Sequence, residues 1–350
     1  MLSLLSAIYG KVADIRNTLY DKGVFESYDF GARCLSIGNI TTGGTGKTPL
    51  VAYVANILAE RGEKVCILTR GYARKDPKNR VLVSDDKNIL VTATESGDEP
   101  FELANKLLGK AIVIADADRV AAAEWAKRRF GVSVFVLDDG FQHRKAKRDV
   151  DIVCIDATNP FGGGKMLPAG RLREPLHNLS RADIVVITRA DMVEDISDLK
   201  FEISQWAPDA AVFVANNTIS GIEKLELFNS MRRPRSEEKE NKDDGVSLTE
   251  PIGLRPAFAF CGLGNPENFF ELIKRNEIAI NGTLAFRDHH IYSQMDIEKI
   301  EDEAQIAGAE VLLTTAKDAV KLSNFKFEMD CFVIEIETVI ENPDKFEAMI

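Results

Sequence analysis

The chain has 350 residues, of which 45% are hydrophobic and 28% charged, and its formal net charge is −11 at pH 7. This composition predicts a soluble globular protein with a sizeable core and room for two domains, and it excludes a disordered chain. The acidic balance excludes a general nucleic-acid-coating surface, because such binding draws most of its free energy from phosphate neutralisation by Lys and Arg. We therefore expect no nucleic-acid partner.

The five cysteines are far apart, odd in number and mostly embedded in apolar runs. This usage is typical of reduced core thiols in a cytosolic protein and not of a disulfide framework or a CxxC metal site. No apolar run approaches the roughly 18 residues needed to cross a bilayer, and the N-terminus lacks the pattern of a signal peptide. The sequence predicts a protein that is neither membrane-spanning nor exported, and it indicates no obligate protein partner.

The first 20 residues predict an amphipathic helix. Apolar residues recur at helical spacing from Leu2 to Leu19, with Lys11 and Arg16 between them. Such a helix packs its apolar face on its own domain, or it lies in a membrane interface. The spacing alone leaves both alternatives open.

Branched apolar runs then alternate with helical patterns up to about residue 222. The runs are "CLSIGNI", "KVCILTR", "AIVIA", "VSVFVLDDG", "DIVCIDA", "ADIVVITRAD" and "AAVFVANN". Strands this uniformly apolar predict a parallel sheet buried on both faces by helices. Between the first two runs, "PLVAYVANILAERGE" has the period of a helix, which Gly62 is placed to end. Residues 1–222 are therefore predicted to form a doubly wound, mostly parallel α/β domain.

A charged stretch separates this domain from a second α/β pattern. Residues 231–256 have few apolar side chains and dense charge of both signs, which is typical of a solvated loop or linker. Apolar runs that begin at Ala257, Glu310 and Asp330 then predict further strands. We expect residues 223–350 to form a second, smaller α/β lobe that includes the charged loop.

The stretch "SIGNITTGGTGKTPLV", from Ser36 to Val51, predicts a phosphate-binding loop between a strand and a helix. In such loops consecutive backbone N–H groups wrap the phosphates at the helix N-terminus, which requires glycines at the turn. Lys47 supplies positive charge and Thr48 a hydroxyl for Mg²⁺. Thr41 stands where the usual pattern has glycine, without removing a phosphate-contacting group. The predicted nucleotide-binding residues are Thr41, Thr42, Gly43, Gly44, Thr45, Gly46, Lys47 and Thr48.

A pair of acidic residues follows another predicted strand. The run "VSVFVLDDG" places Asp138 and Asp139 at the strand end, where NTPases of this loop class hold Mg²⁺ directly or through water. Adjacent carboxylates at a strand end also serve as simple loop caps. With the phosphate loop upstream, we predict that at least one of the two serves the metal ion.

Further polar residues lie on loops that we expect to converge at the carboxyl ends of the strands. A kinase that acts on a sugar hydroxyl needs a carboxylate or an imidazole to take up the proton. A metal site built from "DHH" is a weaker alternative, because it lacks a well-spaced third partner. The candidates in "ESGDEP", "FQHRKAKR" and "FRDHHIY" are Asp98, Glu99, His143, Asp288, His289 and His290.

The run "ITRAD" raises a competing function. Related GTPases select guanine with an Asn/Thr-Lys-x-Asp turn after a strand, and residues Thr188 to Asp191 mimic it with Arg189 in place of Lys. This favours, as the alternative, a GTP-dependent metallochaperone or switch protein. The simpler interpretation is a strand end with a capping Asp. An ATP-dependent ligase is a third alternative, for which the sequence offers no carboxylate-substrate site.

Seven motifs in order, "GNITTGGTGKTP", "RGYARK", "GDEP", "DDGFQH", "LPAGRLREPL", "FRDHHIY" and "AKDAVK", resemble the tetraacyldisaccharide 4'-kinase family, the lipid A 4'-kinases of Gram-negative bacteria. They span residues 38–321. Most family members carry Thr where the strict loop has its first glycine, which accounts for Thr41. The last motif usually reads Thr-Glu-Lys-Asp, and Ala316 replaces the Glu here.

The resemblance implies a P-loop fold and a reaction that uses ATP and Mg²⁺. The γ-phosphoryl group would pass to the 4'-hydroxyl of an acylated, 1-phosphorylated glucosamine disaccharide at the cytoplasmic face of the inner membrane. It implies that Lys47 holds the phosphates and that Thr48, Asp138 and Asp139 serve Mg²⁺. Asp98 would accept the proton, and His289 from the second lobe would orient it.

The lipid substrate adds two expectations. Fork-shaped guanidinium groups suit phosphate oxygens, so arginines are candidates for the substrate's 1-phosphate. A cytosolic enzyme must also reach an acylated sugar in the bilayer, so the resemblance favours a peripheral protein whose N-terminal helix docks on the membrane. The candidate arginines are Arg70, Arg74, Arg119, Arg171 and Arg173.

Overall fold

The structure of the protein is a computed structural model, which describes residues 2–72, 74, 76–231, 255–288 and 290–350. Its strands form one continuous sheet. The strands are β1 (Arg33–Asn39), β2 (Val65–Thr69), β3 (Val81–Ser84), β4 (Ala111–Ala115), β5 (Val134–Asp138), β6 (Val150–Asp156), β7 (Ile184–Thr188), β8 (Ala211–Lys224), β9 (Ala257–Cys261), β10 (Ile280–Ala285), β11 (Val311–Thr315) and β12 (Asp330–Ile340).

The strand order is β10-β9-β11-β12-β8-β7-β6-β1-β5-β2-β4-β3. Neighbouring strands are parallel except for the pairs β3–β4 and β8–β12. The chain enters at the central strand β1 and builds outward on both sides, which is the arrangement of a doubly wound sheet. This confirms the predicted α/β fold with a mostly parallel sheet.

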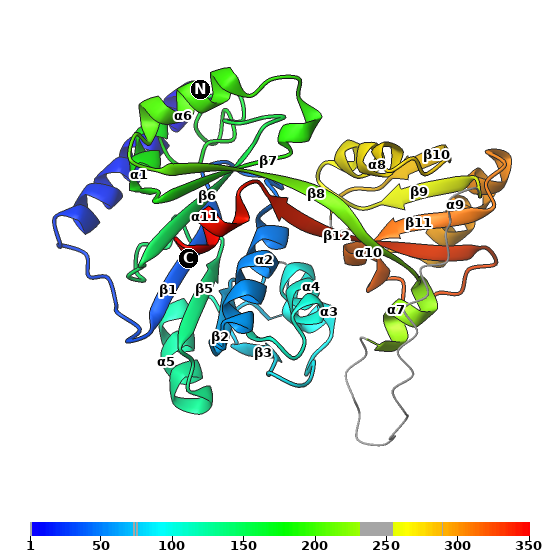
Figure 1. Cartoon of the computed structure of the whole chain (residues 1–350), viewed down its shortest axis with the longest axis horizontal. Coiled ribbons are helices and arrows are strands. Elements are labelled where there is room, and N and C mark those ends of the chain that lie inside the picture. The colour runs from blue at the N-terminus through cyan, green and yellow to red at the C-terminus, as the bar shows by residue number, and fades with distance from the viewer. Residues whose placement is uncertain (1, 73, 75, 232–254, 289) are drawn as a thin grey trace.

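Helices cover both faces of the sheet (Figure 1). They are α1 (Leu2–Asp21), α2 (Lys47–Glu60), α3 (Ala93–Ser96), α4 (Asp98–Lys106), α5 (Arg119–Phe130), α6 (Ser197–Trp206), α7 (Leu225–Met231), α8 (Pro266–Arg275), α9 (Gln294–Ile306), α10 (Ala316–Ala319) and α11 (Pro343–Glu347), with 3₁₀ turns η1 (Leu176–Arg181) and η2 (Ala190–Met192). Alternate residues of β1 face opposite sides. Leu35 joins the core formed with α2 and α4, and Cys34 joins the core formed with α5.

Three segments differ from their predicted form or position. The strands β3 and β10 were not predicted, because β3 has only four residues and β10, whose side chains alternate between half-buried and exposed, lies at the sheet edge. The stretch around Asp98 was expected to be a loop, but Asp98 is the first residue of α4. The charged loop 231–256 lies almost wholly outside the described residues.

Two long strands join the smaller lobe to the core. β8 pairs with β7 of the core through its first half and with β12 through its second half. Figure 1 shows β8 and β12 running together from the core toward α8 and α9. Residue 222, the predicted lobe boundary, lies inside β8, so the division of the chain there stays a prediction.

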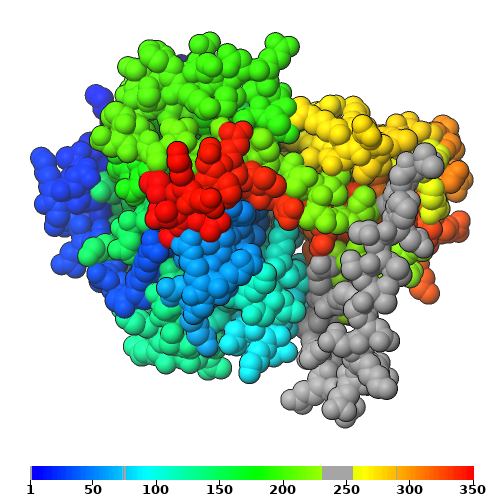
Figure 2. All heavy atoms as spheres, viewed as in Figure 1, coloured from blue at the N-terminus to red at the C-terminus, as the bar shows by residue number. Residues whose placement is uncertain are grey.

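The C-terminal segment returns to the core. Phe346 of α11 is fully buried, with ring centroids 5.3 Å from Phe213, and the Arg61 guanidinium donates to the Ile350 carbonyl (2.7 Å). Figure 2 shows these last residues lying against α2 of the core. Both ends of the second lobe are therefore attached to the core.

The N-terminal helix α1 is attached to the core by polar contacts. The Ser6 hydroxyl donates to the Met166 carbonyl (2.9 Å), and the Asn17 amide donates to the Glu174 carboxylate (2.6 Å). The buried positions of α1 are Ser6, Gly10 and Asn17, so its apolar side chains face outward. In the part of the chain that the structure describes, no helix has the length and apolar character to span a membrane.

The loop after β5 lies beside α1 and carries concentrated positive charge. The Arg16 guanidinium donates to the Gln142 carbonyl (2.9 Å). Burial and, in decreasing order, the charges of Arg119, Arg148, Arg16 and Lys145 lower the pKa of His143 from 6.5 to about 4. His143 is therefore neutral in the folded protein at neutral pH, and its protonation opposes folding.

This yields a stability prediction. Because the folded-state pKa lies below the unfolded value, the unfolded chain binds the proton more tightly, and stability is retained above pH 6.5 and falls as pH drops toward 4. Between pH 6.5 and pH 5, His143 should cost the wild-type protein about 1.5 kcal/mol of unfolding free energy. The His143→Gln variant should lack this loss when urea unfolding is compared at the two pH values. Equal pH dependence in both proteins would show that His143 titrates normally.

Candidate functional site

The phosphate loop joins the end of β1 to the start of α2. Gly43 and Gly46 have positive φ angles of 116° and 77°, a backbone conformation that glycine adopts without strain. The loop is held from beneath, since the Asn39 amide donates to the Thr45 hydroxyl (2.9 Å) and the Thr188 hydroxyl donates to the Thr45 carbonyl (3.0 Å). The N–H groups of the first turn of α2 therefore open onto a preformed loop, which is the arrangement that binds phosphates.

Thr41 has a structural place in this loop. It is 4% exposed and pairs as an isolated β-bridge with Leu172. The next residue, Thr42, donates its N–H to the Arg171 carbonyl (2.8 Å). Thr41 is not among the residues with positive φ. The backbone at this position therefore does not require glycine.

Asp139 is the centre of an ion-pair network beneath the loop. The Arg173 guanidinium binds both of its carboxylate oxygens (2.6 and 3.0 Å), and the Lys47 ammonium lies 3.7 Å from one of them. The buried Arg119 donates to its backbone carbonyl (3.1 Å). Although burial acts in the opposite direction, Lys47 and Arg173 lower the pKa of Asp139 to about 2. The φ of 52° at Asp139 is uncommon for a residue other than glycine and is typical of functional sites.

Asp138, the last residue of β5, is 4% exposed and accepts a hydrogen bond from the Thr69 hydroxyl (2.9 Å). Burial, and then the charge of Asp139, raise the pKa of Asp138. Asp138 is buried and Asp139 is partly exposed, so the two adjacent carboxylates lie at the end of β5 among the cations Lys47, Arg119 and Arg173. Together with the Thr48 hydroxyl they offer oxygen donors, which Mg²⁺ prefers, and Mg²⁺ at nucleotide sites needs only one or two carboxylates besides phosphates and water. The residues present therefore fit this ion.

The candidate arginines fall into three groups. Arg74 and Arg119 are buried, and their guanidinium groups donate to backbone carbonyls, at 2.6 Å from Arg74 to Ala115. Arg173 is engaged by Asp139. Arg70 and Arg171 are exposed. The sequence could not separate these groups, because burial of an arginine depends on segments far from it in the chain.

Asp98 lies at the start of α4, directly after Gly97. Gly97 has a φ of 93°, and a Cβ there would meet the Tyr72 carbonyl at 2.7 Å, so only glycine fits. The Asp98 carboxylate is paired with the Lys321 ammonium of the second lobe (2.8 Å), and both side chains are largely buried. This contact across the two lobes was not predicted, although Lys321 belongs to the quoted "AKDAVK" motif.

The "FRDHHIY" segment is described only in part. Asp288 binds the Lys317 ammonium (2.9 Å). His290 lies 3.2 Å from Asp296 and stacks on Phe286. His289 lies outside the described residues, so its predicted pairing with Asp98 stays a prediction. Among the described residues, no group of three or more His, Cys, Asp or Glu side chains is placed to hold a metal ion.

The turn after β7 also contacts the phosphate loop. Arg189 donates to the Gly44 carbonyl (2.8 Å) and forms an ion pair with Asp156. The sequence drew attention to this turn as a GTPase-like motif, but it did not predict the contact with the loop.

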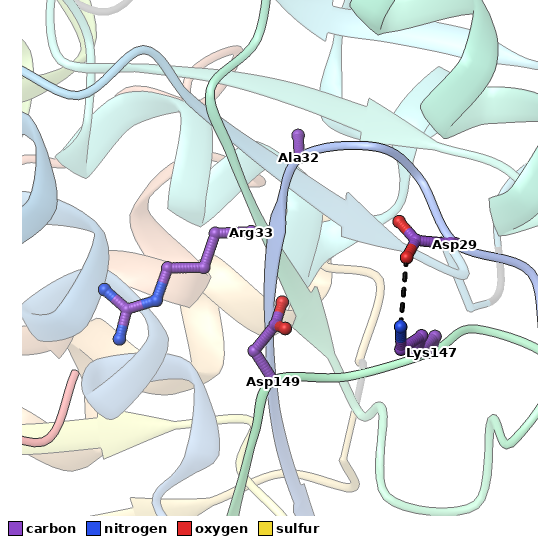
Figure 3. Close-up of a pocket in the computed structure, with 5 residues that line it drawn as sticks. All are labelled: Asp29, Ala32, Arg33, Lys147 and Asp149. Atoms are coloured by element: carbon purple, nitrogen blue, oxygen red, sulfur yellow. Dashed lines mark hydrogen bonds and ion pairs between the residues drawn. The ribbon is translucent and has the colours of Figure 1, made fainter.

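A separate hollow lies at the amino-terminal ends of the parallel strands, at the start of β1. It has a volume of about 420 Å³. Figure 3 shows that two of the residues that line it, Asp29 and Lys147, form an ion pair (3.1 Å). The phosphate loop leaves the other end of β1. This hollow is therefore remote from the candidate site.

Comparisons with known proteins agree with this geometry. The family model described as tetraacyldisaccharide-1-P 4'-kinase matches residues 1–350. A tetraacyldisaccharide 4'-kinase of Halothermothrix orenii is 39% identical over 92% of this chain and 83% of its own length. One from Desulfotalea psychrophila is 35% identical over 96% and 91%.

A solved structure is similar over nearly the whole chain. The "apo" form of LpxK from Aquifex aeolicus, crystallised in complex with ATP, has a TM-score of 0.76 and 31% identity, covering 99% of this chain and 96% of that one. The fold, the phosphate loop and the match over the full length lead to one conclusion. The chain belongs to the tetraacyldisaccharide-1-P 4'-kinase family.

Proposed function

We propose that this kinase transfers the γ-phosphoryl group of ATP to the 4'-hydroxyl of an acylated glucosamine disaccharide 1-phosphate, using Mg²⁺ at a membrane surface. The observation that carries the proposal is the ion-pair network of Lys47, Asp139 and Arg173 beneath a phosphate loop, in a chain that one kinase family model matches throughout. The GTP-dependent switch protein is not favoured, because the relatives are kinases.

The loop and Lys47 would position the phosphates of ATP. Phosphoryl transfer has a loose transition state with charge spread over the γ-phosphate oxygens, so alignment and charge neutralisation provide most of the acceleration. The loop amides of residues 41–48 would bind the phosphates, and Lys47 would neutralise the developing charge. Asp139, held by Arg173, would orient the Lys47 ammonium toward the phosphates.

Thr48 and Asp138 would hold Mg²⁺, with Asp139 next to them. Both oxygens of Asp139 are engaged by Arg173, whereas Asp138 has one described partner, Thr69. This supports Asp138 as the direct ligand and Asp139 as the residue that orients the site. Mg²⁺, when bound, supplies positive charge that stabilises the transferring phosphoryl group.

Asp98 is our candidate for the proton acceptor of the sugar hydroxyl, oriented by His289. Its contact with Lys321 of the second lobe places it where both lobes meet. Because an ammonium partner also weakens a carboxylate as a base, proton transfer would contribute less than phosphate positioning. The exposed Arg70 and Arg171 remain our candidates for the 1-phosphate of the substrate.

The membrane contact would be made by α1. Its outward side chains include Leu2, Leu4, Leu5, Ile8, Val12 and Ile15, with exposed fractions of 46–67%. Since the helix is attached to the core through its polar side, this apolar face is available for the interface between lipid head groups and acyl chains. This supports a peripheral protein at a membrane surface. We propose that this surface is the cytoplasmic face of the inner membrane, where the acylated substrate would be reached without extraction from the bilayer.

The phosphate-binding role of Lys47 predicts a large catalytic loss. In Lys47→Ala, the initial rate of acceptor phosphorylation from γ-labelled ATP should fall by at least about a thousandfold, because charge stabilisation at the transferring group is lost. The matched control is Lys64→Ala, which removes an exposed ammonium paired with Asp86 and should keep the wild-type rate. A Lys47→Ala enzyme of normal rate would rule out this role.

The Asp98 assignment predicts a partial loss. In the same assay, Asp98→Ala should lose about a hundredfold in kcat, keep measurable turnover and show a changed pH profile, because the base is lost while phosphate positioning remains. The KM for ATP should change little. Full activity with an unchanged pH profile would eliminate Asp98 as the proton acceptor.

The apolar face of α1 predicts membrane binding that acidic substitutions remove. The double variant Leu5→Asp/Ile8→Asp should sediment with anionic phospholipid vesicles at least about tenfold less than wild type, because charges in the interface are unfavourable. The control Ile306→Asp changes an isoleucine of the second lobe that is 87% exposed and should not alter binding. Equal sedimentation of all three proteins would place the membrane contact elsewhere.

A further inference from the structure

The turn Thr188 to Asp191 is attached to the phosphate loop at two points. Thr188 donates to the Thr45 carbonyl, and Arg189 donates to the Gly44 carbonyl. Arg189 has a φ of 56°, an uncommon conformation outside glycine that is kept where the surroundings require it. The turn that carries Asp191 is therefore held at a fixed position beside the loop that would bind the phosphates.

A pocket of about 100 Å³ adjoins this turn, between the core and α8 of the second lobe. Phe269 and Leu272 give it an apolar wall, and Asn217 and Asn268 place amide groups in it. In the amide orientation that satisfies both groups, the Asn268 oxygen accepts from Arg189 Nε (2.9 Å). An apolar wall with a few placed hydrogen-bonding groups suits a planar nucleobase.

The Asp191 carboxylate in this pocket already has a strong partner. The Arg275 guanidinium, at the end of α8, donates to it at 2.6 Å. Guanine presents two adjacent N–H donors, at N1 and N2, that a carboxylate accepts together. Adenine offers an acceptor at N1 and no exocyclic amino group at C2, so it gains nothing from this carboxylate.

We propose that the Asp191–Arg275 ion pair selects ATP over GTP by occupying the carboxylate that would otherwise recognise guanine. Bound guanine would have to displace Arg275 and leave the guanidinium without its partner, whereas adenine requires no such exchange. This inference rests on the proposed function only in that the phosphate loop binds ATP. It assigns the GTPase-like turn a new role, in which the second lobe disables guanine recognition.

The test compares ATP and GTP binding directly, by equilibrium titration of fluorescent, non-hydrolysable analogues of both nucleotides with Mg²⁺. In Arg275→Ala, the ratio of the Kd for the GTP analogue to that for the ATP analogue should fall about five- to tenfold, mainly through tighter GTP binding, because Asp191 is released. Arg275→Gln should shift the ratio in the same direction. The ion pair is about one-third exposed on each side, so we expect no larger change.

Two further proteins isolate the carboxylate. Asp191→Asn/Arg275→Ala should return the ratio to the wild-type value, because an amide cannot accept from both guanine donors. Lys274→Ala, which removes the neighbouring ammonium paired with Glu271 (2.7 Å), should leave it unchanged. An unchanged ratio in both Arg275 variants, or a lowered ratio that persists in the double variant, would overturn the proposal. Wild-type binding of ATP without sugar phosphorylation would instead refute the proposed function alone.

Discussion

The placement of the Asp139 carboxylate is the interaction on which the candidate site depends. It directly follows β5, and its backbone there is left-handed, with Arg173 and Lys47 as the partners of its carboxylate. Without Asp139, Lys47 and Arg173 would lose the carboxylate that both contact, and Arg173 would keep its hydrogen bond to the Asn39 side chain (3.1 Å). With Asp139, Lys47 has a carboxylate partner, and the charge of Asp139 raises the pKa of the neighbouring Asp138. The Arg119 side chain of α5 donates a hydrogen bond to the Asp139 backbone carbonyl. The network places fixed charges beside the phosphate loop, and fixed charges of this kind promote phosphoryl transfer.

The continuous sheet gives the second lobe a direct part in this site. Because β8 and β12 extend from the core into the lobe, residues distant in sequence meet at the lobe boundary. Lys321 contacts Asp98 there, and Arg275 contacts Asp191 at a second point. The first contact includes the candidate proton acceptor, Asp98. The second borders the pocket that we propose for the nucleobase.

The sequence predicted the elements whose signals are local. The apolar runs predicted the core strands, and the glycines with Lys47 and Thr48 predicted the loop, because strand burial and phosphate binding are encoded within a dozen residues. Partner choice was not predictable, because it depends on the folded chain. The pairing of Asp139 with Arg173 joins two loops, and that of Asp98 with Lys321 joins two lobes. Likewise, Arg74 is buried and Arg70 is exposed, although both belong to the motif "RGYARK", so the sequence could not predict which of them is accessible to substrate. The outward apolar face of α1 also required the structure, since its spacing fits either interpretation.

The most direct test of this account is to incubate the protein with γ-labelled ATP, Mg²⁺ and the acylated disaccharide 1-phosphate in mixed micelles, and to locate the label by phosphorus NMR of the product. The account predicts a bis-phosphate that carries the label on the 4'-oxygen, and its loss in an Asp139→Asn variant that remains folded. Label found only as inorganic phosphate, label at another position, or undiminished transfer by Asp139→Asn would contradict it.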